Sequence, residues 1–402
     1  MTVGCLVALT PALPAGSVTG RDELDTLLAR YDTETDGPVR DGLSARIDTI
    51  AHQKYAAVSR LYWYVDLESA KAAARAQRRP ILHLRMLGSL EDDLSCANSR
   101  LFRATLYANQ DLSGFLRERF VLYWSSERAV PRVTIDYGDG RTLERTTAGN
   151  SAHYVLDEHG KVLDVLPGLY TAAAFRQELE RSLTLAAQVR DTSDSDRARL
   201  VAEYHRQRVA DAERDWERVA SMPGMAGVRE RWTQSRPETT LSAAQRATVS
   251  KAAVEVKDLR VVAKEFAPEV LPEDQMETWS AAGRLLYGAA TPVLDGTSRA
   301  LVVRLHNAGP PELRATDEGL RAVITRLEQT IVGDTALNQL RLRPQISREI
   351  IRRGGRIDFP SLNAWVYATV FRTPREDAWL GLLPRDVFTG LPGDGVVVRG
   401  AR

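Results

Sequence analysis

The stretch from 80 to 102, PILHLRMLGSLEDDLSCANSRLF, constrains the fold of this chain more than any other. It begins with a short apolar run that is entered through Pro80, which is typical of a buried strand rather than a helix. A polar loop follows. Ser95 can then cap the next helix, because its hydroxyl can accept the free amide hydrogens of the first turn. The sequence therefore predicts a core strand, a loop and a helix in succession.

Cys96 would lie at the beginning of that helix. Unpaired amides and the helix dipole favour a thiolate at such a position, which would make the sulfur nucleophilic. The alternative is a small buried core residue, which is a common role for a free cysteine. The other cysteine, Cys5, lies near the N-terminus, so a Cys5–Cys96 disulfide is a further alternative.

The bulk composition excludes some classes of function. A chain of 402 residues with 44% hydrophobic residues is long enough for more than one domain with a buried core. Its net charge is +1 with 27% charged residues, so no strong attraction to nucleic acid or to an anionic membrane is expected. No apolar run is long enough to span a bilayer. We expect no cofactor and no transmembrane span.

The N-terminal segment leaves the compartment open. Residues 3–14 are apolar and small residues follow them, as in the core and cleavage region of a secretory signal. The positive residues that usually precede such a core are missing. If a longer signal precedes Met1, the protein is exported to the cell envelope; otherwise it is cytoplasmic, and the segment is a tail or a first strand.

Residues 61–188 predict a sheet covered by helices, preceded by a segment over 1–60 with short helices of its own. The alanine-rich stretch 67–78 is a good helix with Asp66 as its cap. We expect helices over 21–31, 44–50, 67–78, 96–107, 111–119 and 172–186, and strands or extended arms over 61–65, 81–87, 120–124, 131–137, 141–147, 152–156 and 161–166.

Residues 189–402 have a different composition and predict an all-α domain. A break rich in Ser and Asp is followed by long charged stretches that prolines separate. Helices are expected over 197–220, 242–262, 274–286, 296–305, 317–331 and 334–351. The tail over 357–398 is rich in aromatic residues, Pro and Gly, and we expect it to pack as loops and short helices.

Residues 62–183 resemble thioredoxin-fold domains of a broad bacterial kind. The matching pieces are Asp66, Ala70 and Ala74, the entry Arg79-Pro80-Ile81-Leu82, Cys96 at a helix start, Phe120-Val121, Tyr154-Val155-Leu156-Asp157, His159-Gly160-Lys161-Val162, and Gly168 before a helix with Phe175. The resemblance implies a thioredoxin-like sheet covered by helices, a mixed α+β or α/β fold, followed here by the all-α domain. It also implies a thiol site at Cys96.

The chain departs from the family pattern at that site. The family has two cysteines separated by two residues, whereas Cys96-Ala97-Asn98-Ser99 has serine at the second position. The family's cis-proline would align near Ser151, and no proline is there. A dithiol oxidoreductase needs a second sulfur to release a mixed disulfide, so here a partner or glutathione would have to supply it.

Further side chains are candidates for the site. Ser99 would hydrogen-bond a thiolate, or it is an exposed helical serine. Arg100 and Arg103 would stabilise a thiolate or bind an anionic substrate, or they belong to a solvated helix face. His83 and His153 lie in or beside central strands and would converge on a metal or proton site. Because no metal-ligand spacing accompanies them, buried and hydrogen-bonded histidines are favoured and no metal is expected.

These observations leave two functions open, and they do not decide whether the protein is an enzyme. In the first, Cys96 is a monothiol that forms mixed disulfides or is reversibly oxidised, with Ser99 and Arg100 as helpers and a thiol compound or protein as substrate. In the second, the protein is a non-catalytic scaffold, and its helical half and aromatic tail contact a protein partner.

Overall fold

The computed structural model describes residues 20–147, 149–229, 273–288, 293–308, 314 and 316–373. Cys5 and the apolar N-terminal segment lie outside the described residues, as do the helix expected over 242–262 and the tail beyond 373. Of the helices that the described ranges contain, none is both long enough and apolar enough to cross a bilayer.

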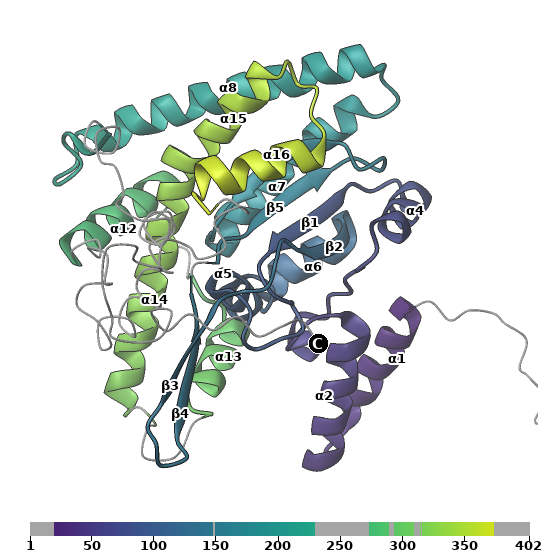
Figure 1. The fold of residues 1–402 in the computed structure, drawn as a ribbon, viewed down its shortest axis with the longest axis vertical. Helices are drawn as coiled ribbons and strands as arrows, with labels where there is room; N and C mark the ends of the chain where they lie inside the picture. Colours follow the sequence, from purple (N-terminus) through teal and green to yellow (C-terminus); the bar gives the residue numbers. More distant parts are fainter. Residues whose placement is uncertain are drawn as a thin grey trace, which may run out of the picture.

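The first half of the chain contains all the described strands together with helices that precede, separate and follow them (Figure 1). The strands are β1 (Ile81–Met86), β2 (Val121–Ser126), β3 (Arg132–Asp136), β4 (Thr142–Thr146), β5 (Ala152–Leu156) and β6 (Val162–Pro167). The helices of this half are α1 (Gly20–Thr33), α2 (Gly37–Ala51), α3 (Ala56–Ser59), α4 (Leu67–Gln77), α5 (Ala97–Leu101), α6 (Gln110–Arg119) and α7 (Ala172–Val189). A π-helical turn, η1 (Phe102–Leu106), continues α5.

The second half is helical throughout its described residues, as expected. Its helices are α8 (Asp194–Ala220), α12 (Glu273–Tyr287), α13 (Gly296–His306), α14 (Asp317–Leu337), α15 (Arg343–Arg352) and α16 (Phe359–Trp365). Two π-helical turns are η4 (Asn338–Leu342), between α14 and α15, and η5 (Val366–Val370), after α16. The molecule is therefore a mixed α/β fold with a helical C-terminal region.

Four strands form the main sheet in the order β2-β1-β5-β6. β1 pairs in parallel with β2 and antiparallel with β5, and β5 and β6 form an antiparallel hairpin. β1 has a neighbour on each side, and its apolar run is buried because helices cover the faces of the sheet. The stretch expected as a strand over 61–65 makes only one isolated bridge, from Tyr64 to Tyr123 of β2.

The register of β1 and β5 decides which side chains share a face of the sheet. His83 is opposite Tyr154, and Leu84 is opposite His153, so the two histidines lie on opposite faces. Phe359 at the start of α16 covers the face of His83. Phe102 of η1 and Phe175 of α7 cover the face of His153.

One hydrophobic core joins the sheet to the C-terminal helices. Ile81 and Val165 of the sheet belong to the same buried cluster as Ile346 of α15 and Leu362 of α16. The expected boundary between 188 and 189 coincides with the end of α7, but the core continues across it. α15 packs against both α8 and β6 (Figure 1).

Several helix boundaries differ from expectation. The helix expected over 44–50 begins earlier, at Gly37, because Asp36 accepts a hydrogen bond from the amide of Val39 and caps α2. The break expected between 331 and 334 does not exist. Pro344 lies in the first turn of α15, where its missing amide hydrogen costs little.

Candidate functional site

Cys96 occupies the N-cap of α5, at the end of the loop that leaves β1. Its backbone is extended, with φ −60° and ψ 154°, and its carbonyl accepts a hydrogen bond from the amide of Arg100. Its own amide donates to the carbonyl of Leu87, which holds the helix start against the end of the strand. The sequence predicts Ser95 as the cap of this helix. The structure has the cap one residue later, at Cys96, whose amide forms the hydrogen bond to Leu87.

Serine hydroxyls surround the sulfur. The thiol of Cys96 donates to Oγ of Ser99 at 3.3 Å, and its Sγ lies 3.0 Å from Oγ of Ser151. Ser99 in turn lies 2.7 Å from Oγ of Ser95. Cys96 and all of these serines are fully buried. The sulfur is therefore enclosed in the protein, where it belongs to the hydrophobic core and also has two hydroxyl contacts.

Two features close the site from outside. Gly149 lies against Cys96 so closely that a Cβ added to it would be 2.2 Å from the Cβ of Cys96. Tyr367 of η5 extends over the same loop, with its hydroxyl 3.1 Å from the carbonyl oxygen of Asn150 and 3.3 Å from that of Arg85. The C-terminal helical region thus holds the loop 149–151 over the thiol.

The two arginines of this helix lie in different surroundings. Arg103 is buried and donates to the carbonyls of Leu90 and Asp92 and to Oγ of Ser95. Burial lowers the pKa of Arg103 from its ordinary value, and the neighbouring acidic groups, Cys96 among them, act against that shift. Arg100 donates to Oγ1 of Thr146 at 3.2 Å and so connects α5 to β4. Arg103, which the sequence places on a helix face, is the more enclosed of the two.

The two histidines do not form one site. His83 Nε2 lies 2.7 Å from Oγ of Ser125, and His153 Nε2 lies 2.6 Å from the hydroxyl of Tyr107. Burial lowers the pKa of His153 to about 3 and that of His83 well below its ordinary value. Among the described residues, no group of His, Cys, Asp or Glu side chains is arranged to hold a metal ion.

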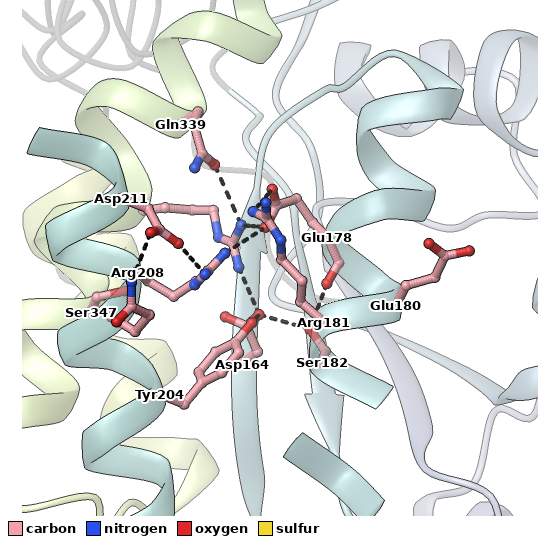
Figure 2. A network of polar contacts seen from close by, with 12 residues as sticks. Asp164, Glu178, Glu180, Arg181, Ser182, Tyr204, Arg208, Asp211, Gln339 and Ser347 are labelled. Atoms are coloured by element: carbon pink, nitrogen blue, oxygen red, sulfur yellow. Dashed lines mark hydrogen bonds and ion pairs between the residues drawn. The ribbon is translucent and has the colours of Figure 1, made fainter. Parts of the chain in front are cut away.

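A second polar cluster connects the sheet to the helical region (Figure 2). Asp164 of β6 accepts hydrogen bonds from Arg343 of α15 at 2.7 Å, from Tyr204 of α8 at 2.7 Å and from Ser182 of α7 at 2.8 Å. Burial alone would raise the pKa of Asp164. Arg343 and these hydrogen bonds outweigh it and hold that pKa below its ordinary value. Asp164 is therefore charged and internally paired.

Glu178 of α7 completes this cluster. It is fully buried, pairs with Arg343, and accepts a hydrogen bond from Arg181 at 2.8 Å. Arg208 of α8 lies 3.8 Å from the same carboxylate. These charges have partners on four different elements, so we interpret the cluster as a structural connection.

Several residues of the thiol site have no signal in the sequence. Ser151, Gly149 and Tyr367 are far from Cys96 along the chain, and only the pairing of β5 with β1 and the packing of η5 bring them to it. The sequence marks Ser151 only as a position that lacks the family's proline. A single sequence contains no pattern that couples these positions.

No family model, no curated protein and no solved structure matches this chain. Its class is defined by fold and site together. It is a mixed α/β protein with a four-stranded sheet and a helical C-terminal region. Its one described cysteine is a buried thiol at a helix N-cap.

Proposed function

We propose that this chain is a thioredoxin-like protein that serves as a non-catalytic scaffold. The strand order β2-β1-β5-β6, in which β1 and β2 are the only parallel neighbours, supports the thioredoxin-like assignment, as does a cysteine at the start of the helix after the first core strand. The family's resolving cysteine is Ser99 in this chain, which argues against ordinary disulfide exchange.

The burial of Cys96 is the observation that carries the scaffold proposal. Exchange requires a second sulfur to reach bonding distance of about 2.05 Å. Here the sulfur is fully buried, and Gly149, Ser99 and Ser151 occupy its immediate surroundings. Buried structural cysteines are inert for this reason. The thiol then serves as a packed, hydrogen-bonded core group.

The hairpin of β3 and β4 supports a role in binding a protein partner. These strands form a separate two-stranded sheet that projects away from the main sheet (Figure 1). Within the described part of the chain each pairs only with the other, so their outer backbone edges have no partner strand. An added strand is a common way for a peptide to bind such an edge. Tyr137 at the tip is 56% exposed.

One observation favours a monothiol redox role as the second candidate. Ser151 contacts the sulfur and can donate to it, Ser99 accepts from the thiol, and a helix start favours a thiolate. For this role the loop 149–151 would have to open so that an oxidised thiol compound can form a mixed disulfide with Cys96. The Cys96 thiolate would attack one sulfur of a disulfide compound such as oxidised glutathione, the S–S bond of that compound would break, and its other sulfur would leave as a thiolate. A second thiol molecule would later release Cys96 by the same exchange in reverse.

Thiol accessibility separates the two functions. In a Cys5→Ser background only Cys96 can be labelled. The scaffold proposal expects iodoacetamide to modify Cys96 no faster than the protein unfolds, and oxidised glutathione to leave the folded protein unmodified. Stoichiometric glutathionylation of the folded protein at a rate above that of unfolding would overturn the scaffold and establish the monothiol. Mass spectrometry of the intact chain reads both reactions.

A further inference from the structure

A small pocket lies where the start of α1, the end of α6 and the start of β2 meet, well away from Cys96 in the sequence. Its volume is about 40 Å³. Because one water-sized group needs roughly 10–15 Å³, the pocket has room for one small polyatomic group. Its lining residues include Arg21, Arg60 and Arg117, together with Tyr62, Tyr64 and Gln77.

The arginines gather positive charge around this pocket. Burial lowers the pKa of Arg117, and the charges of Arg60 and Arg21 lower it further. Arg79 borders the same group: burial lowers its pKa, and Arg21 adds to that effect. Guanidinium groups that repel one another raise the free energy of the empty site, and a bound anion relieves that cost.

The acidic residues nearby neutralise these arginines only in part. Arg60 pairs with Asp32 at 2.5 Å. Arg79 instead donates to the carbonyl of Arg117 at 3.0 Å, and Arg117 to the carbonyl of Ser59 at 3.4 Å. Within the described ranges, neither Arg79 nor Arg117 has a carboxylate within ion-pair distance. Asp25 lines the pocket and Glu118 acts on both arginines, which still leaves positive charge in excess.

Neutral donors and a helix start complete the surroundings. The hydroxyl-bearing rings of Tyr62 and Tyr64 line the pocket. Gly20, the first residue of α1, lies against Tyr62, since a Cβ added to it would be 2.7 Å from the tyrosine hydroxyl oxygen. The first turn of α1 carries Asp22 and Glu23, which offset the partial positive charge of the helix start, so the positive charge at the pocket comes from the arginines.

We propose that this pocket binds a small oxyanion of the phosphate class, either inorganic phosphate or the head of a phosphate monoester. Guanidinium groups match phosphate oxygens with paired hydrogen bonds, and Arg21, Arg60 and Arg117 reach the pocket from three different segments. The pocket admits one such group, and the tyrosine hydroxyls add neutral donors. This site is independent of the function proposed for Cys96.

Titration calorimetry on the full chain tests the proposal, with inorganic phosphate and phenyl phosphate as the two probes. Ionic strength is held constant with sodium chloride, because a general salt effect would otherwise imitate binding. We expect saturable binding of at least one probe, and Arg21→Gln should weaken it about tenfold or more through the loss of a charge-assisted hydrogen bond. Arg141→Gln on the exposed hairpin is the matched control and should bind like the wild type.

The stability of the unliganded variants distinguishes a ligand site from a structural cluster. Arg21→Gln should unfold at the same or a higher urea concentration than the wild type, because it removes repulsion and, among the described residues, no ion pair. If Arg21→Gln fails to fold, Arg117→Gln replaces it in the binding assay. Tighter binding of phenyl phosphate than of phosphate identifies a monoester ligand, and the reverse identifies the free ion. The proposal would be overturned if neither probe binds saturably. It would also be overturned if Arg21→Gln, or Arg117→Gln in its place, binds as tightly as the control Arg141→Gln.

Discussion

Gly149 lies directly against Cys96, and a Cβ built on the glycine would be 2.2 Å from the Cβ of the cysteine. Two carbon atoms that are not bonded to each other do not approach so closely. The absence of a side chain at Gly149 therefore lets the loop 149–151 close over the thiol, and Ser151 of the same loop reaches the sulfur. This contact connects the loop before β5 to the start of α5.

Replacement of Gly149 by alanine should destabilise the protein by about 1–3 kcal/mol, because the loop must move away from Cys96. Urea unfolding monitored by circular dichroism measures this. Gly42→Ala is the matched control: Gly42 lies inside α2, and an added methyl group would meet open space, so alanine there should stabilise by up to about 1 kcal/mol. Equal effects at the two positions would contradict the close contact.

Loss of the Tyr367 hydroxyl should expose the thiol. Tyr367→Phe removes the polar contacts to the carbonyls of Asn150 and Arg85, at a cost of about 1 kcal/mol. Iodoacetamide should then label Cys96 faster in a Cys5→Ser background. Tyr137→Phe, at the exposed hairpin tip, is the control. The lower stability of Tyr367→Phe will by itself raise the labelling rate through global unfolding. If the measured rate rises no more than that, Tyr367 does not cover the site.

Removal of the charge of Asp164 should destabilise the protein by about 3–5 kcal/mol, because Arg343 would remain buried without that partner. Asp164→Asn keeps the shape of the side chain and isolates the charge. Asp139→Asn on the exposed hairpin is the control. Chemical unfolding of both variants checks this. Similar midpoints for Asp164→Asn and Asp139→Asn would show that the cluster has no structural role.

The same carboxylate predicts a pH dependence. The pKa of Asp164 is lower in the folded protein than its ordinary value of about 3.9. Its contribution to stability is therefore complete above that ordinary value and is lost as the pH falls through the lower, folded-state pKa. Below about pH 4 the wild type should lose stability as Asp164 becomes protonated, and Asp164→Asn should not show this part of the loss. An unchanged acid limb would contradict the lowered pKa.

His153 should make stability fall at mildly acidic pH. Its pKa is about 3 in the folded protein because of burial, against 6.5 ordinarily, so folding favours the neutral ring. Stability from this group is complete above pH 6.5 and is lost progressively as the pH falls toward 3. Between pH 6.5 and 5 the loss amounts to about 2 kcal/mol. In urea unfolding, His153→Gln should therefore lose about 2 kcal/mol less stability than the wild type between pH 6.5 and 5.

The control for this measurement is the exposed His306, whose replacement by Gln changes no buried contact. If His153→Gln and His306→Gln alter the slope equally, burial of His153 is not its cause. Gln at 153 keeps a group that can hydrogen-bond Tyr107, so the variant is expected to fold.

Much of the secondary structure could be predicted from local patterns. The helix with Asp66 at its cap, the apolar strand after Pro80 and the hairpin over 152–166 are all present, because capping and hydrophobic alternation act between near neighbours. The strand expected over 61–65 does not form beyond one bridge. Its aromatic residues pack beside the sheet without joining it, as Trp63 does against Tyr107.

The site shows where local patterns stop. The sequence alone determined that a cysteine follows the first core strand at a helix start, since that depends on residues within one short stretch. Only the tertiary structure decided that this sulfur is enclosed, because Gly149, Ser151 and Tyr367 come from distant segments that strand pairing and helix packing bring together. Likewise, the register of β1 against β5 placed His83 and His153 on opposite faces. Long-range packing fixes such relations, and no spacing along the chain encodes them.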